Sequence, residues 1–169
     1  MILIADMIYS KVKSIIANWS EKDIYAISFF VYSNETYKYK EFQNVSYCAI
    51  SYNTEEDCGN AGQYDEERWN YAFWRKDETP IIDPDNPDEL TDLLFEWYRE
   101  NGIENIGYEN DSCYDSEMRY IGKGPAGHYE LLTIVSRVAK RLQQEGYIAD
   151  KFGKRLPIII HGFEYAWYD

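Results

Sequence analysis

The chain has 169 residues, of which 28% are charged and 17% are aromatic, and its formal net charge is −13. This composition predicts one folded domain over residues 1–169 and excludes a disordered acidic tail, which would contain few aromatic residues. The acidity also argues against nucleic acid or an anionic membrane surface as a partner, because both are bound through clustered lysine and arginine.

The negative charge is concentrated in the middle of the chain. Residues 46–120 contain five basic and twenty acidic side chains, a net charge of −15, whereas residues 1–45 are neutral and residues 121–169 carry +2. The same middle stretch contains thirteen aromatic side chains. Carboxylates interleaved with aromatic rings can attract and anchor a basic partner, but the pattern is also typical of a solvated face that only keeps a protein soluble.

The first part of the chain predicts one helix and three strands. Apolar residues at three- and four-residue spacing favour an amphipathic helix over residues 4–19. Residues 24–32 are apolar on both faces, which is typical of a central strand covered on two sides. The alternation in residues 37–40 predicts an edge strand, and residues 45–52 complete a short meander.

The middle part predicts a helical turn, a strand and a helix. Thr54, followed by acidic residues, indicates a turn that ends near Gly59. Residues 68–74 alternate as a strand would. Asn86 as N-cap and Pro87 at the first helical position then start a helix, which ends at Gly102.

The last part predicts a second long helix and a final strand. The helix covers residues 129–145 and is ended by Gly146, and the strand covers residues 156–160. The whole order predicts an α+β fold: an antiparallel sheet with N-terminal, central and C-terminal helices packed on it.

The cysteines and the N-terminus indicate a cytoplasmic protein. Cys48, Cys58 and Cys113 are odd in number and match no metal-binding spacing, so we expect reduced thiols. The N-terminal residues lack the basic region of a secretory signal, and no apolar run approaches the roughly 20 residues of a membrane span.

Two groups of residues are candidates for chemistry. The acidic run 83–89 suggests calcium, but an EF-hand loop needs Gly and Glu where Asp88 and Leu94 stand, so we expect no metal and no cofactor. His128 or His161 could act as a general base beside a carboxylate, yet no nucleophile motif accompanies them. We assign no catalytic residue, and a small carboxylate- or histidine-dependent hydrolase is the alternative function.

Several short segments resemble a bacterial family of unknown function that is associated with polymorphic-toxin immunity proteins. The segments are Asp23–Phe29, Asn53–Glu56, Asp65–Trp69 and Tyr71–Trp74. Members of this family are encoded beside polymorphic toxins, where small acidic α+β proteins neutralise the co-encoded toxin. The resemblance therefore implies a binder without catalytic residues.

We accordingly expect a non-enzymatic immunity protein, monomeric or a small homo-oligomer, that binds a toxin with a basic surface, such as a nuclease. Its contact surface is expected in Glu55–Glu67 and Asp111–Glu117, with Tyr64 and Tyr114 as anchors. Trp69 and Trp74 are expected in the core instead. The predicted charged contact residues are Glu55, Glu56, Asp57, Asp65, Glu66, Glu67, Asp111, Asp115 and Glu117.

Overall fold

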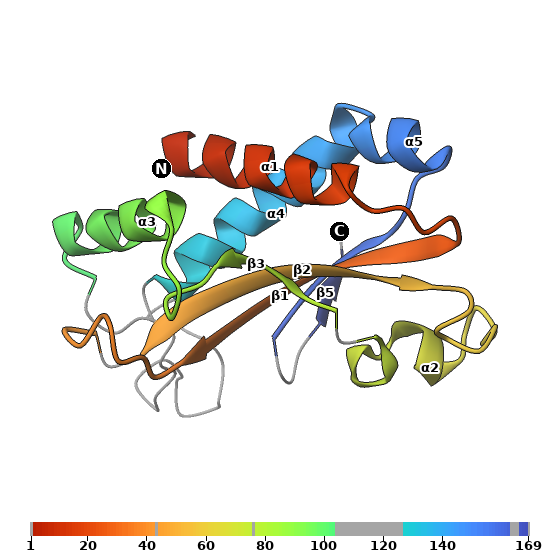
Figure 1. Ribbon diagram of the computed structural model, residues 1–169, viewed down its shortest axis with the longest axis horizontal. Coiled ribbons are helices and arrows are strands. Elements are labelled where there is room, and N and C mark those ends of the chain that lie inside the picture. The colour runs from red at the N-terminus through yellow and green to blue at the C-terminus, as the bar shows by residue number, and fades with distance from the viewer. Residues whose placement is uncertain (1, 43, 76, 104–126, 163–165, 169) are drawn as a thin grey trace, which may run out of the picture.

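The computed structural model describes residues 2–42, 44–75, 77–103, 127–162 and 166–168 (Figure 1). Its helices are α1 (Ile2–Ala17), α2 (Glu66–Trp69), the 3₁₀ helix η1 (Tyr71–Phe73), α3 (Glu89–Glu100), α4 (His128–Gln144) and α5 (Tyr147–Phe152). Its strands are β1 (Ile24–Asn34), β2 (Val45–Thr54), β3 (Thr79–Ile82), β4 (Ile158–His161) and β5 (Ala166–Tyr168). The predicted α+β class is confirmed.

The five strands form one sheet in the order β3-β2-β1-β4-β5. β1 and β2 are antiparallel along almost their whole length, with Phe29 opposite Ile50. β4 lies parallel to β1 on its other edge, with Ser28 beside Ile159. The β2–β3 and β4–β5 pairs are antiparallel. The sequence predicted an antiparallel sheet, and the sheet is mostly antiparallel, with the parallel β1–β4 pair as the exception.

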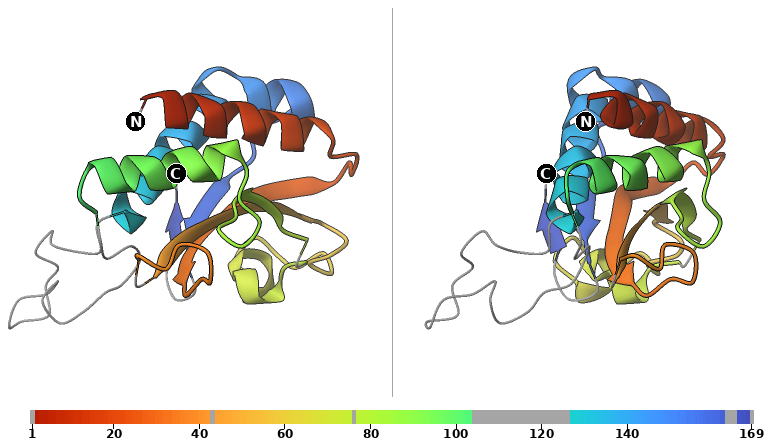
Figure 2. Two further views of the ribbon diagram at one scale, coloured as in Figure 1. Left: turned by 60° about the vertical axis from the view of Figure 1, so that its left-hand side comes forward. Right: turned by 90° about the vertical axis from the view of Figure 1, so that its left-hand side faces the viewer.

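The helices divide between the two faces of the sheet. Helices α1, α3, α4 and α5 cover one face, and α2 and η1 lie against the opposite face near one end (Figures 1 and 2). Residues 24–31 of β1 are buried without interruption, which confirms the prediction of a central strand covered on two sides.

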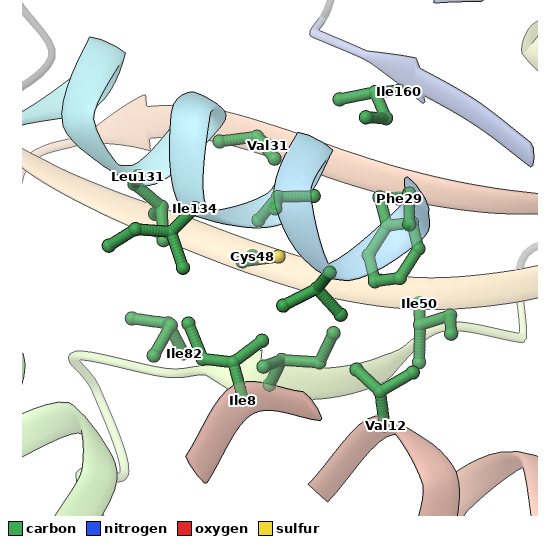
Figure 3. Packing of buried hydrophobic residues seen from close by; sticks show 14 of the residues in the cluster. Ile8, Val12, Phe29, Val31, Cys48, Ile50, Ile82, Leu131, Ile134 and Ile160 are labelled. Atoms are coloured by element: carbon green, nitrogen blue, oxygen red, sulfur yellow. The ribbon is translucent and has the colours of Figure 1, made fainter. Parts of the chain in front are cut away.

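The main core lies between the sheet and the four helices. Ile8 and Val12 of α1 and Leu131 and Ile134 of α4 point toward the sheet (Figure 3). They meet side chains of four strands: Phe29, Val31, Cys48, Ile50, Ile82 and Ile160. The three- and four-residue spacing of the apolar helix positions is what aligns them on one face.

The edge strand predicted at residues 37–40 is absent, and residues 35–42 instead lie in a loop in which Tyr39 and Phe42 are buried. Tyr39 stacks on Phe95 of α3 with ring centroids 4.1 Å apart, and its hydroxyl donates to Asp92 at 2.7 Å. The two aromatic residues therefore fold back onto a helix, because packing there buries more apolar surface than an exposed strand would. The predicted meander was wrong.

The strand predicted at residues 68–74 is also absent, since α2 and η1 occupy this stretch. Asn70 starts the 3₁₀ helix by accepting a hydrogen bond from the backbone N–H of Ala72. A hydrogen bond between an asparagine side chain and the backbone two residues further on stabilises a turn, and this turn competes with strand pairing. Residues 54–59, predicted as a helical turn, form hydrogen-bonded turns in which Thr54 accepts from the backbone N–H of Asp57.

Both long helices predicted in the second half are present. The N-cap of α3 is Asp88, whose carboxylate accepts from the backbone N–H of Thr91 at 2.9 Å, and not Asn86 as predicted. Gly102 follows the end of α3 with φ +65°, and Gly146 follows the end of α4 with φ +77°. Both values lie in the left-handed region that glycine adopts without strain.

Substitution of Ile27 tests the two-sided burial of β1. Ile27 is 0% exposed, so Ile27→Asp places an unpaired carboxylate in the core and is expected to lower the free energy of unfolding by several kcal/mol. The matched variant Ile27→Val removes one methylene and should cost only about 1 kcal/mol. Chemical denaturation measures both, and an Ile27→Asp protein as stable as the parent would contradict the assigned core.

Candidate functional site

Residues 55–75, here termed the acidic cap, follow β2 in the chain and precede β3. They cover part of the sheet face opposite helices α1, α3, α4 and α5 (Figure 1). Trp74 is buried there, and Trp69 and Tyr71 are partly buried, against Tyr25, Ala26 and Ile159. The prediction of a core position therefore holds for Trp74, whereas Trp69 is only partly buried. The three aromatic side chains fix the cap to the sheet.

Arg68 is directed into the acidic cap. Its guanidinium forms two hydrogen bonds of 2.7 Å with the carboxylate of Glu55 and lies 4.1 Å from the centre of the Tyr25 ring. The hydroxyl of Tyr25 donates in turn to the backbone oxygen of Arg68 at 2.5 Å. The hydrogen bonds from Arg68 hold the pKa of Glu55 below its ordinary value, so this pair ties the start of the cap to α2.

Arg75 is also paired with carboxylates of the protein itself. It lies within 3.4 Å of carboxylate oxygens of Glu21 and Asp57 and 2.9 Å from Asp77. Its guanidinium also lies 4.7 Å from the centre of the Tyr52 ring. Both described arginines of the cap are therefore held by internal partners and do not neutralise its outer surface.

The outer surface of the acidic cap carries carboxylates and aromatic rings. Glu56 and Glu67 are exposed, and neither takes part in a hydrogen bond or ion pair of its side chain within the described residues. Tyr64 is 92% exposed and Phe73 is 51% exposed. An exposed tyrosine beside unpaired acids is suited to contact with a basic protein surface.

The predicted contact residues of the cap fall into two groups. All of them except Glu55 are exposed, and Glu56 and Glu67 have no side-chain partner within the described residues, whereas Glu66 accepts from the side-chain amide of Asn70 at 2.8 Å. The remaining three carboxylates have internal partners: Glu55 binds Arg68, Asp57 binds Thr54 and Arg75, and Asp65 accepts from the backbone N–H of Gly62 at 2.6 Å. We assign to these three the stabilisation of the cap.

The second predicted segment, with Asp111, Tyr114, Asp115 and Glu117, lies outside the described residues. Sequence reasoning missed Phe73, which the predicted strand had placed on the same face as Trp69 and Tyr71. No signal in the sequence marks its exposure, because that depends on the 3₁₀ turn of η1.

His161, the other candidate for chemistry, is buried beneath the cap. It is 3% exposed, and its Nε2 lies 2.7 Å from the hydroxyl oxygen of Ser28, which is 0% exposed. Nδ1 lies 3.1 Å from the carbonyl oxygen of Gly162, so Nδ1 carries the proton and Nε2 accepts from Ser28. The ring is covered by Phe30 and Tyr71.

The Ser28–His161 pair lacks the surroundings that nucleophilic catalysis needs. Ser28 lies in the middle of β1, where β2 and β4 pair along both edges. The backbone N–H groups that would form an oxyanion hole are thus taken up by the sheet. The pair is therefore a buried polar contact whose hydrogen bonds are satisfied internally.

The titration of His161 gives a measurable consequence. Burial lowers its pKa in the folded protein below the value of about 6.5 in the unfolded chain. The stability contributed by the neutral ring is fully present above pH ~6.5 and is lost as the pH falls through the lower folded pKa. We expect urea denaturation to show this loss in the parent as the pH is lowered below about 6.5, and a smaller one in His161→Gln. Equal slopes in the parent and in His161→Gln would contradict the assignment.

The described residues contain no group of three or more His, Cys, Asp or Glu side chains able to hold a metal ion. Asp83, in the acidic run considered for calcium, instead accepts from the backbone N–H groups of Asp85 and Asn86. None of the helices described is long and apolar enough to cross a bilayer. No protein-family model, curated protein or solved structure matches the chain.

Proposed function

We propose that this protein is an immunity protein that binds and neutralises a bacterial protein toxin with a basic surface through the outer face of the acidic cap. The observation that carries the proposal is the division of charge within the cap. Arg68 and Arg75 are paired with carboxylates of the protein itself, while Glu56, Glu66, Glu67 and Tyr64 are exposed.

This arrangement supports binding because the cap is held in place before a partner arrives. Trp74 fixes the cap to the sheet, and the Arg68–Glu55 pair holds the start of the cap to α2, so little conformational freedom is lost on association. The carboxylates supply electrostatic attraction, which raises association rates by up to about a thousandfold. Tyr64 and Phe73, which are exposed in the free protein, would become buried against the toxin, and this contact slows dissociation.

A toxin with a basic cleft is the partner that fits this surface. Enzymes that act on nucleic acid hold phosphates with clustered lysine and arginine, and the carboxylates of the cap would be drawn to the same side chains. The thiols of Cys48 and Cys58 are free and buried, which agrees with action in the reducing cytosol, where a toxin must be neutralised before it acts.

Charge reversal on the cap tests the docking surface. Glu56→Lys combined with Glu67→Lys is expected to weaken toxin binding at least tenfold and to leave folding unchanged, because both side chains are exposed. Tyr64→Ala should raise the dissociation rate by roughly tenfold. The probe is the C-terminal domain of the protein encoded directly upstream, measured by surface plasmon resonance and by growth of cells that express it.

The matched control reverses the same number of charges elsewhere. Glu96 and Glu100 are exposed on α3, in the helical layer on the other side of the sheet. Glu96→Lys combined with Glu100→Lys should bind and protect like the parent. Equal losses in both double variants would show a dependence on net charge alone, and cells killed with and without the parent protein would refute the immunity function.

Ionic strength separates steering from anchoring. If the carboxylates of the cap accelerate encounter, the association rate should fall markedly between low and near-molar salt, because salt screens exposed charges. The dissociation rate should change much less, since it depends on the desolvated aromatic contacts. Stopped-flow mixing measures the association rate, and a rate unaffected by salt would exclude electrostatic steering.

A further inference from the structure

Tyr25 of β1 contacts the acidic cap with its ring as well as with its hydroxyl. The guanidinium of Arg68 lies over the ring, 4.1 Å from its centre. The rings of Trp69 and Trp74 meet it in T-shaped geometry, with centroids 5.8 and 6.0 Å away. Tyr25 is only 4% exposed, so one buried residue of the sheet contacts three residues of the cap.

The backbone oxygen of Arg68 is the acceptor on which these residues converge. It accepts from the hydroxyl of Tyr25 at 2.5 Å and from Nε1 of Trp74 at 3.0 Å. Arg68 lies in α2, directly after the exposed Glu66 and Glu67. A helix of four residues is not stable by itself, so the contacts of this oxygen with the sheet and with Trp74 hold α2 in place.

Asn53 of β2 determines the direction in which the hydroxyl of Tyr25 donates. The Nδ2 group of Asn53 donates to the Tyr25 oxygen at 2.9 Å, and because a hydroxyl has one proton, that proton is left for Arg68. Burial raises the pKa of Tyr25 to about 12, so the donor is present at neutral pH. Oδ1 of Asn53 accepts from the backbone N–H of Arg75 at 3.4 Å. Asn53, which is 0% exposed, therefore reaches both ends of residues 68–75.

We propose that the hydrogen-bond relay from Asn53 through Tyr25 to the backbone oxygen of Arg68 positions the docking surface of the acidic cap. This inference rests on the proposed function, and it makes Tyr25 and Asn53 positioning residues that the toxin does not touch. The relay holds α2 in one arrangement, with Glu66 and Glu67 outward, before the partner arrives. Without it the cap adopts several arrangements, and the apparent affinity falls with the fraction that can dock. The association rate carries this loss, because a bound toxin itself holds the cap.

Tyr25→Phe tests the relay, because it removes the hydroxyl and keeps the ring with its aromatic contacts. With the same toxin domain, stopped-flow mixing is expected to show an association rate about fivefold lower than that of the parent, with a dissociation rate close to that of the parent. Tyr147→Phe is the matched control. The Tyr147 hydroxyl also donates to a backbone oxygen, that of Lys13 at 2.9 Å, but in the helical layer. This variant should bind like the parent.

Hydrogen exchange followed by mass spectrometry tests the relay without the toxin. In Tyr25→Phe, peptides from residues 66–74 should exchange faster than in the parent, because α2 has lost a contact that holds it. Asn53→Asp should give the same change, since a carboxylate accepts the proton of Tyr25 instead of donating to its oxygen. Peptides from residues 89–100 should exchange as in the parent, which separates a local change in the cap from a loss of the whole fold.

Three results would overturn the proposal. They are unchanged exchange of residues 66–74 in Tyr25→Phe, faster exchange there with the association rate of the parent, and an equal loss of association rate in Tyr147→Phe. The last result would assign the effect to overall stability. If the parent itself does not bind the toxin domain, the proposed function fails, whereas the exchange measurement still reports whether the relay holds α2. The two failures are therefore distinguishable.

Discussion

The architecture depends on β1, which is hydrogen-bonded along both edges and buried on both faces. β2 pairs with one edge and β4 with the other, so the backbone groups of its middle residues are satisfied. Alternate side chains enter two different layers, with Phe29 under the helices and Ser28 on the opposite face. The helical layer and the acidic cap thus both pack against β1, and a shift of either layer would disturb this strand.

The sequence predicted those parts of the fold that local patterns encode. The continuous apolar run of β1 and the capped, periodic stretches of α3 and α4 each carry their own signal. The burial of Tyr39 and Phe42 has no such local signal. The alternation of residues 37–40 fits an exposed strand as well as it fits a loop folded onto Phe95. The parallel pairing of β1 with β4 likewise has no local sequence signal, since it joins segments that are far apart in the chain.

The candidate site was predictable in outline and not in detail. Its acids and Tyr64 are evident in the sequence, and the structure places them on one cap. Which acids are available depends on where Arg68 and Arg75 point, and that direction is set by the rings of Tyr25 and Tyr52 in other strands. Glu55 and Glu56 are neighbours in sequence, yet one holds the cap together and the other faces solvent.

The parallel β1–β4 pair also sets an order of events during synthesis. The β1–β2 hairpin is complete early, but β4, the strand that covers its second edge, emerges from the ribosome only after helices α3, α4 and α5 have been synthesised. Contacts between such distant segments close slowly, because the loop between them must first lose its freedom. Until then the hairpin exposes an unpaired edge rich in isoleucine and phenylalanine, and the nascent chain must be protected from pairing with another copy of itself.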